Sequence, residues 1–465
     1  MKMDEMILVS VDDHVVEPPN LFDGRLAAKW KDRAPRVVRK ADGTDVWVFE
    51  GRQIPNLAVN AVAGRPPEEY GMEPTAYEQL RAGCYDITAR IGDMNASGIL
   101  GSLCFPSFPG LCGELFAQQD DKAMSQAMVE AYNDWHIDSW CGAYPGRFIP
   151  MAIPMMWDPE RLAAEVRRVA RKGCHAITFP DNPAANGHPS LHDERWDPVW
   201  KACCDEGTVV CMHIGSGSGM SFDEMAAPAE ILIASVPISL FHCAMNLVYS
   251  TALRKFPDLR IALSEGGIGW IPYFLERADY TYQHHRHWTH QNFGGDRLPS
   301  DVFRQHIITC FIDDAAGLEA RHRIGIDTIT WECDYPHSDS TWPNAPEALW
   351  RSLTGLSDEE IDKITHRNAM RHFHYDPFTH LPRAQCTVGG LRAQATGVDL
   401  SVKPGGGGKP PSAYERGYVT VGDLLQQIAT AFAVPFAESA AVPAAAEAEA
   451  RGFAGGRSRP ESQGE

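Results

Sequence analysis

A short polar motif follows the first apolar run of the chain and has the residue types of a metal site. Residues 6–11 form an apolar, β-branched run typical of a strand, and Asp12-Asp13-His14 come directly after it. Alternation along a strand places Asp12 and His14 on one face. A carboxylate oxygen and an imidazole nitrogen at that spacing can both reach one divalent cation at about 2.0–2.2 Å. A turn aspartate beside a solvated histidine would give the same motif, so the pair needs support from elsewhere.

Two later apolar runs also end in residues that can bind a metal. His213 ends the run 208–213 before a Gly/Ser-rich segment, and Asp334 directly follows the run 329–333. Either residue alone is common as a helix cap or as an ordinary hydrogen bonder. Together, Asp12, His14, His213 and Asp334 supply two imidazoles and two carboxylates at the carboxyl ends of predicted strands. This set predicts a divalent-metal site, with Zn²⁺ as the expected ion and Mn²⁺ as the alternative, and with room for water or substrate.

A carboxylate and two glycines follow the sixth predicted strand. The sequence there is Leu263-Ser264-Glu265-Gly266-Gly267. Glycines allow the backbone to pass close to a ligand, and Glu265 would point into the same mouth as the metal-binding residues. A buried carboxylate beside a metal can take or give a proton. The alternative interpretation is an acid that favours the positive end of a helix dipole.

The elements that must position these residues alternate between strand-like and helix-like segments. Amphipathic helices are clearest at 159–172, 196–206, 247–256 and 268–282, and the eight predicted strands are 6–11, 99–105, 148–153, 174–179, 208–213, 259–264, 306–311 and 328–331. This order predicts an α/β fold, a (β/α)8 TIM barrel. A doubly wound open sheet shows the same alternation. The number of strands and the polar residues at their carboxyl ends favour the barrel.

Two segments depart from the regular alternation. A long insertion, about 17–86, follows the first strand and holds a hairpin-like piece at 46–52, so we expect a lid or a substrate-specificity element there. After Pro377 the composition becomes linker-like, with four glycines at 405–408 and an Ala-rich run at 440–450. We therefore expect a catalytic domain at 1–380 and a low-complexity extension at 381–465, largely disordered apart from one helix at 421–432.

Composition excludes several classes of partner. The chain has 465 residues, of which 44% are hydrophobic, and a formal net charge of −19. The hydrophobic content allows a large core, and the acidic charge argues against nucleic acid and anionic membranes as partners. Without a run of about 18 apolar residues or a secretory signal, and with 12 cysteines but no CxxC pair, we expect a cytoplasmic protein that binds a small-molecule substrate. A homo-oligomer is the usual state of such enzymes.

These motifs resemble the amidohydrolase superfamily, and within it the amidohydrolase-related group that includes aminocarboxymuconate semialdehyde decarboxylase and γ-resorcylate decarboxylase. The similarity extends over about residues 6–377. It rests on Asp12-x-His14 with Glu17-Pro18, the segment 256–261, the Glu265-Gly266-Gly267 turn, Asp334-Tyr335-Pro336-His337 and Arg367-Asn368-Ala369. The resemblance implies a metal-dependent barrel whose ligands are Asp12, His14, His213 and Asp334.

One position departs from the pattern of this group. Its members typically carry a histidine at the start of the sixth-strand Gly-Gly turn, where it serves as acid or base, and here Glu265 occupies that place. The proton-transfer residue is therefore open, with Glu265, His242, His337 and the ligand Asp334 as the candidate catalytic residues. The cluster His284, His285 and His287 is interpreted as a solvated helix end.

The resemblance and the site together predict a divalent-metal-dependent enzyme. We expect a non-oxidative decarboxylase (carboxy-lyase) of a small carboxylated, aromatic substrate, with Arg52, Arg90 and Arg286 as candidate donors to the carboxylate. The alternative is a metal-dependent hydrolase of an amide, ester or lactone, which would use the same ligands. A second alternative is a non-catalytic barrel that serves as a binding protein.

Overall fold

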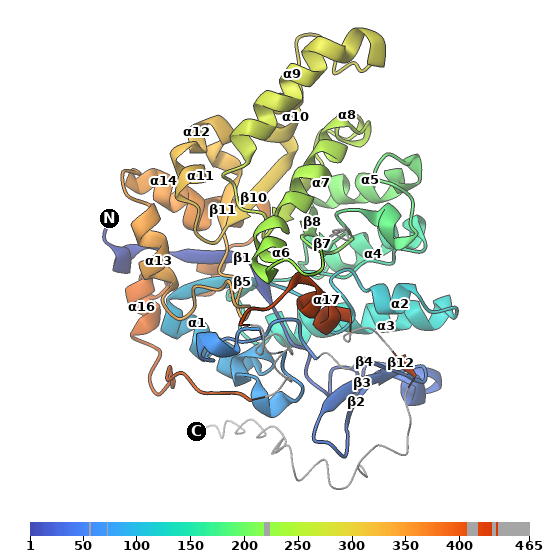
Figure 1. The fold of residues 1–465 in the computed structure, drawn as a ribbon, viewed down its shortest axis with the longest axis vertical. Coiled ribbons are helices and arrows are strands. Elements are labelled where there is room, and N and C mark those ends of the chain that lie inside the picture. Colours follow the sequence, from blue (N-terminus) through green and yellow to red (C-terminus); the bar gives the residue numbers. More distant parts are fainter. Residues whose placement is uncertain (55–56, 72, 218–223, 407–416, 430–433, 436–465) are drawn as a thin grey trace, which may run out of the picture.

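The computed structural model describes residues 1–465 apart from 55–56, 72, 218–223, 407–416, 430–433 and 436–465 (Figure 1). An eight-stranded parallel sheet lies at its centre, in the order β6-β5-β1-β11-β10-β9-β8-β7. These strands are β1 Leu8–His14, β5 Ile99–Phe105, β6 Phe148–Ile149, β7 Ala176–Thr178, β8 Val209–His213, β9 Arg260–Ser264, β10 Ile307–Phe311 and β11 Ile329–Trp331. Each coincides with one of the eight predicted strands.

The sheet closes on itself between its two end strands. Ala152, just after β6, forms a parallel bridge with Ile177 of β7. Its amide donates to the carbonyl of Ala176 at 3.0 Å, and its carbonyl accepts from the amide of Thr178 at 2.9 Å. This closure excludes the open doubly wound sheet, and the (β/α)8 barrel is confirmed.

Alternate strand residues fill the inside of the barrel. One buried cluster takes Val9 and Val11 from β1 and every second residue from the strands around it, including Val209 and Cys211 of β8. Phe373 joins this cluster from the segment after the last barrel strand. Because inward residues of a small barrel pack in layers, its interior is a solid core, and any active site has to lie at the mouth.

Helices form the outer layer. The helices are α1 Ile87–Ser97, α2 Glu114–Ala117, α3 Lys122–Asp134, α4 Pro159–Ala170, α5 Asp197–Glu206, α6 Ala229–Ser235, α7 Ile238–Tyr249, α8 Ala252–Lys255, α9 Ile271–Thr289, α10 Pro299–His306, α11 Ala315–Glu319, α12 Arg321–Ile324, α13 Ala345–Ser352, α14 Asp358–Asp362, α15 Asn368–His372, α16 Val388–Arg392 and α17 Val421–Ala429. The bounds predicted for one helix, 247–256, are wrong. Ser250 is buried in an extended conformation and ends α7, so α8 is a separate short helix.

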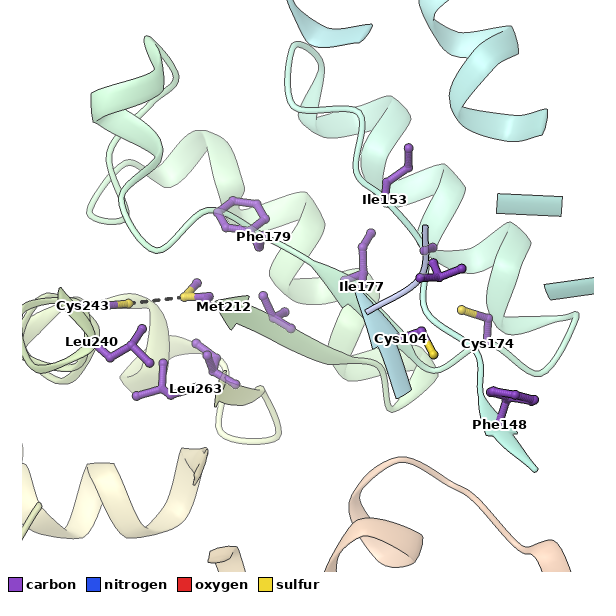
Figure 2. Close-up of a cluster of buried hydrophobic side chains, with 14 of the residues drawn as sticks. Cys104, Phe148, Ile153, Cys174, Ile177, Phe179, Met212, Leu240, Cys243 and Leu263 are labelled. Carbon is purple, nitrogen blue, oxygen red and sulfur yellow. Dashed lines mark hydrogen bonds between the residues drawn. The ribbon is translucent and has the colours of Figure 1, made fainter. Parts of the chain in front are cut away.

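A second apolar cluster lies between the strands and this helical layer. Figure 2 shows part of it, where Met212 of β8 and Leu263 of β9 meet Leu240 and Cys243 of α7. The stretch Ala229–Tyr249, which spans α6 and α7, is apolar and long enough to cross a membrane by length and composition alone. The buried side chains of α7 are used instead to cover the barrel strands.

The insertion after β1 forms a small antiparallel sheet of its own. It contains β2 Arg36–Arg39, β3 Asp45–Phe49 and β4 Arg52–Ile54. The C-terminal strand β12 Val434–Pro435 joins it, in the order β12-β4-β3-β2. The predicted hairpin is present, because β3 and β4 are joined by Glu50 and Gly51, which have φ values of 48° and 71°. Two positive φ values are typical of the two-residue type I′ hairpin turn, in which glycine is favoured.

Part of the C-terminal extension is ordered against the barrel, contrary to the linker expected from 381 onward. Val388 and Leu391 of α16 are buried, and the amide of Val388 donates to the carbonyl of Met6 at 2.8 Å. Arg392 forms a two-point ion pair with Glu347 of α13. A few buried apolar residues therefore hold a segment whose composition is otherwise polar and glycine-rich. The helix predicted at 421–432 appears as α17, and the run 440–450 lies outside the described residues.

Candidate metal centre

An irregularity in β1 brings its polar end into the barrel mouth. Val9 and Val11 point inward, so simple alternation would turn Asp12 and His14 outward. The pairing of β1 with β5 shifts register between Ser10 and Asp13. Beyond that shift, Asp13 accepts a hydrogen bond from Ser102 on the outer side of the sheet, while Asp12 and His14 join His213 at the mouth. A bulge-like irregularity of this kind re-aims side chains beside a functional site.

Three ligand atoms from β1 and β8 surround one point. His14 Nε2 lies 3.5 Å from Asp12 Oδ1, and His213 Nε2 lies 3.6 Å from Asp12 Oδ2. Ligands placed at about 2.1 Å from a tetrahedral ion are separated from one another by roughly 3.4 Å. The spacing of these atoms therefore fits a common cation of the predicted kind.

Asp334 completes the group from the other side of β1. Its Oδ1 lies 3.4 Å from His14 Nε2. Its backbone amide donates to the carbonyl of Asp12 at 2.9 Å, and the amide of Tyr335 donates to Asp13 Oδ1 at 3.0 Å. These main-chain bonds fix the loop after β11 against the end of β1, so the structure brings all four predicted ligands together.

The ligand atoms lack ordinary hydrogen bonds. Both carboxylate oxygens of Asp12 and of Asp334, and Nε2 of His14 and of His213, are buried and make no hydrogen bond of ordinary geometry with the described residues. Two of them have a close polar neighbour, because His337 Nδ1 lies 2.8 Å from Asp334 Oδ1 and Glu265 Oε2 lies 2.9 Å from His213 Nε2. Burying even one such polar atom without a partner costs about 1–3 kcal/mol. Imidazole and carboxylate atoms of the four residues approach one another at 3.4–3.6 Å without a hydrogen bond of ordinary geometry between them, and the donor set of two imidazoles and two carboxylates fits a divalent cation.

The surroundings prepare the imidazoles for metal binding. His213 Nδ1 lies 2.7 Å from the carbonyl oxygen of Ile214 and donates to it, which leaves the Nε2 lone pair facing the site. Burial, together with the neighbouring rings of His337 and His213, lowers the pKa of His14 well below its usual value. His14 can therefore present a neutral nitrogen atom to a cation.

The carboxylates, in contrast, are crowded. Burial, and after it the nearby charges of Glu332 and Glu265, raises the pKa of Asp12 well above its usual value. Like charges in one buried site disfavour ionisation of each other, and a cation between them removes that penalty. The electrostatics and the unsatisfied oxygens thus indicate the same missing partner.

Two of the candidate proton-transfer residues border the ligand atoms. Glu265 Oε2 lies 2.9 Å from His213 Nε2, and His337 Nδ1 lies 2.8 Å from Asp334 Oδ1. Glu265 and Asp334 both have positive φ values, 62° and 59°, which are uncommon for residues with a side chain. Such strained backbone is concentrated at functional sites, and here it occurs at the carboxyl ends of two barrel strands.

The structure separates His242 from this group. His242 lies on α7 with an exposed side chain, and its carbonyl accepts a hydrogen bond from Asn246 one turn later. The clusters of metal-binding side chains found among the described residues do not include it. The expectation of a catalytic His242 therefore receives no support from its position.

The three arginines considered as carboxylate donors also lie elsewhere. Arg90 is buried and donates to the carbonyl oxygens of Gly83 and His14, so it supports the end of β1 from behind. Arg52 is exposed on β4 and Arg286 is exposed on α9. The positions of these three arginines give no support to a role as carboxylate donors.

Sequence reasoning missed one acid beneath the metal-binding residues. Glu332 is buried, and its Oε2 accepts from the thiol of Cys310 at 2.5 Å and from the amide of Glu265 at 3.2 Å. Burial raises its pKa to about 8. Glu332 therefore supports the turn that carries Glu265. The sequence signal that could have identified Glu332 is its position: a charged residue inside an apolar run, two residues before Asp334.

The long insertion borders the same mouth, as expected for a specificity element. The amides of Val62 and Ala63 both donate to the carbonyl of Pro336 at 3.0 Å. Burial lowers the pKa of His337, but the carboxylates of Asp334, Glu265 and Glu73, the last of them in the insertion, together raise it to about 9. The insertion thus contacts the loop that carries Asp334 and His337.

Comparisons with known proteins agree with this fold and site. A model of the amidohydrolase family matches residues 72–374, more than half of the chain. A search of curated proteins gives no match. The similar solved structures include an amidohydrolase from Mycobacterium avium subsp. paratuberculosis (20% identity, 79% of this chain and 99% of that chain, TM-score 0.60). The similar structures and the geometry agree on the barrel architecture.

Two similar structures are decarboxylases. One is 5-carboxyvanillate decarboxylase from Novosphingobium aromaticivorans, solved with manganese and 4-hydroxy-3-methoxy-5-nitrobenzoic acid (20% identity, 80% of this chain and 99% of that chain, TM-score 0.55). The other is 2,6-dihydroxybenzoate decarboxylase from Rhizobium (17% identity, 79% of this chain and 99% of that chain, TM-score 0.51). At these identities the likeness concerns the fold. With the family match over residues 72–374, the chain belongs to the amidohydrolase family.

Proposed function

We propose that this protein is a divalent-metal-dependent decarboxylase of a small aromatic carboxylic acid. The observation that carries the proposal is the convergence of Asp12, His14, His213 and Asp334, whose buried ligand atoms lie 3.4–3.6 Å apart and make no hydrogen bond of ordinary geometry with the described residues. The two decarboxylases with the same fold act on hydroxylated benzoic acids, and one was solved with manganese, so we propose Mn²⁺ or Zn²⁺ as the ion.

Charge balance supports a cation that binds the substrate carboxylate. Asp12, Glu265 and Asp334 place three carboxyl groups around the mouth. A substrate carboxylate added to them would be repelled without a positive charge in their midst. A bound divalent ion would supply Lewis-acid binding of the substrate's carboxylate and of a neighbouring oxygen.

The proposed roles of the protein's own residues follow from their positions. Decarboxylation breaks the bond between the ring carbon and the carboxylate, releases CO₂, and leaves an electron pair on the carbon that must take a proton. We propose that His337, 2.8 Å from Asp334, or Glu265, 2.9 Å from His213, delivers that proton. Glu332 positions Glu265 through its backbone amide.

The direct test is product analysis on protein loaded with Mn²⁺. A panel of hydroxybenzoic acids, with and without methoxy groups, would be incubated with the protein, and CO₂ and the decarboxylated phenol would be measured together. We expect equal amounts of the two products, and neither from the Asp334→Asn variant. Metal loading without CO₂ from any acid in the panel would contradict the proposal.

Hydrolysis of an amide, ester or lactone is the second candidate function. It is favoured by one observation, the 2.9 Å contact between Glu265 and His213, which puts a proton acceptor beside the metal-binding nitrogen. A carboxylate there could take a proton from an attacking water. Release of an acid with an alcohol or amine from neutral esters or amides, or of a hydroxy acid from lactones, with no CO₂ from the benzoic acids, would assign this activity instead.

A further inference from the structure

The strands that carry the metal-binding residues lie on opposite sides of the barrel. In the closed order β6-β5-β1-β11-β10-β9-β8-β7, three strands separate β1 from β8 in either direction. The chain that leaves β1 builds the insertion with β4, and the chain that leaves β8 builds α6. Both connections start at the carboxyl ends of parallel strands, so both lie on the side of the mouth. The residues attached to β4 and to α6 therefore lie on that side.

The C-terminal extension is attached at the α6 side. Thr420 pairs with Pro228 in an antiparallel bridge just before α6. The amide of Ala229 donates to the carbonyl of Val419 at 2.9 Å, and the amides of Val421 and Gly422 donate to the carbonyls of Ala227 and Met225. Val421 is fully buried. This end is thus fixed by main-chain bonds and by apolar contact with the start of α17.

The same extension is attached at the β4 side. The strand β12 (Val434–Pro435) pairs antiparallel with β4, with Val434 opposite Gln53 and Pro435 opposite Arg52. It covers the free edge of β4 in the small sheet, an edge that would otherwise be open to pairing. Figure 1 shows α17 between α6 and the β2–β4 sheet, in agreement with these two attachments.

We propose that residues 419–429 and 434–435, here called the C-terminal strap, cross the barrel mouth and form a wall of the substrate site that limits the size of the molecules admitted. The proposal depends on the proposed function in one respect: the site that the strap covers is the candidate metal centre. The strap is attached to the connections that follow the two strands carrying Asp12, His14 and His213. Its position therefore restricts access to the metal-binding residues and selects small, flat substrates.

The first experiment measures access to the mouth without metal or substrate. A thiol introduced by Glu265→Cys would be labelled in the full-length chain with N-ethylmaleimide and with a polymer-linked maleimide, and the labelled peptide quantified by mass spectrometry. Gly422→Val is the variant that loosens the strap, because a Cβ at Gly422 would lie 3.0 Å from the carbonyl oxygen of Met225. Val402→Ala, at an exposed position outside the strap, is the control.

We expect Gly422→Val to speed labelling by the bulky reagent about tenfold, because a weakened attachment opens more often, and to speed the small reagent much less. Val402→Ala should leave both rates unchanged. Equal rates for the bulky reagent with and without Gly422→Val would overturn the proposal. This result does not depend on whether the protein binds a metal or decarboxylates any acid.

A second experiment closes the strap instead of loosening it and keeps the native site. Thr420 and Pro228 form a non-hydrogen-bonded antiparallel pair, whose Cα atoms are about 4.5 Å apart, within the range that a disulfide spans. The double variant Pro228→Cys/Thr420→Cys would be loaded with Mn²⁺, and removal of the ion by EDTA would be followed in its oxidised and reduced forms.

We expect removal of Mn²⁺ to be about fivefold slower in the oxidised form and to return to the wild-type rate on reduction, since the cross-link suppresses local opening. Identical rates in the two forms would contradict the strap. A wild-type protein that takes up no Mn²⁺ would refute the proposed metal function, and the labelling experiment would then decide the strap alone.

Discussion

His337 Nδ1 lies 2.8 Å from Asp334 Oδ1, and both residues belong to the turn that follows β11. The positive φ of Asp334 bends the chain so that its carboxylate faces His14 while His337, three residues later, returns to the same carboxylate. The ring of His337 also packs against that of His14, with centroids 3.9 Å apart. One turn thus supplies the carboxylate that we propose as a metal ligand together with the imidazole that we propose as a proton donor.

His337→Gln should separate proton transfer from metal binding. We expect kcat for the best acid of the benzoic-acid panel to fall by about 10²–10⁴, the usual contribution of a positioned acid or base. The Mn²⁺ content should stay at the wild-type level, because His14, His213, Asp12 and Asp334 remain. Elemental analysis and steady-state kinetics check the two parts. His242→Gln, at the exposed position on α7, is the matched control and should retain full activity.

Asp12→Asn should have opposite effects on metal binding and on the stability of the metal-free protein. Loss of the charge should weaken Mn²⁺ binding by more than about 100-fold, as measured by titration with a competing chelator. Burial and neighbouring carboxylates disfavour the Asp12 charge, so the metal-free variant should melt about 1–3 °C higher than the metal-free wild type. Asp339→Asn, at a nearby acid outside the ligand set, should leave Mn²⁺ affinity unchanged. Wild-type affinity in Asp12→Asn would contradict the assigned site.

The sequence was sufficient for the barrel strands and for the residues at their ends. Apolar runs that stop at His213 or Asp334 mark the end of a buried strand. They also mark the start of the polar mouth, because each barrel strand ends where the mouth begins. The face on which Asp12 and His14 lie could not be deduced from alternation. It depends on the register shift after Ser10, which arises from the pairing of β1 with β5 and from the loop after β11.

Predictions from local composition were wrong in segments whose structure depends on contacts with residues far away in the sequence. The segment 381–406 has few apolar residues, yet Val388 and Leu391 reach the base of the barrel and order α16. Apolar periodicity continues across Ser250, so the break between α7 and α8 leaves no signal in the sequence. The residues proposed as ligands were recognisable because metal binding constrains residue type and because they end predicted strands, whereas His242 shows that residue type alone says little about where a side chain lies.

Glu17→Gln should destabilise the loop that supports the mouth. Glu17 is fully buried and accepts hydrogen bonds from the amides of Ser107 and Phe108, at 3.0 and 2.8 Å, and from the hydroxyl of Tyr132 at 2.8 Å. A glutamine would turn an amide donor toward one of the two backbone donors. We expect a loss of about 1–3 kcal/mol in the free energy of unfolding in urea at pH 8. Glu68→Gln, on the exposed surface, should change it by less than about 0.5 kcal/mol.

Glu17 also predicts a pH dependence of stability. Burial raises its pKa to about 7, so between pH 4.5 and 7 the folded state holds a proton that the unfolded state has released. Its contribution to stability is therefore complete below pH 4.5 and is lost as the pH rises through 7. Urea titrations of the wild type and of Glu17→Gln across this range should differ in slope. Parallel curves would show that Glu17 keeps its ordinary pKa in the folded protein.

His136 predicts the opposite slope at acid pH. The ring is buried in the π-helical segment Trp135–Cys141, and burial lowers its pKa to about 4. Below pH 6.5 the unfolded chain takes up a proton that the folded ring does not, so the contribution of His136 is complete above pH 6.5 and is lost as the pH falls toward 4. At 1.36 kcal/mol per pH unit this loss approaches about 3 kcal/mol.

The variant His136→Gln should remove this share of the acid sensitivity, while the similarly buried His306 and His366 retain theirs. The free energy of unfolding in urea would be measured between pH 4 and pH 7 for the wild type, for His136→Gln and for His287→Gln. His287 is exposed near the end of α9, so its substitution should leave the slope unchanged. A wild-type slope in His136→Gln would mean that the buried ring is protonated in the folded state, with Met151 and Cys141 then facing a charged imidazolium.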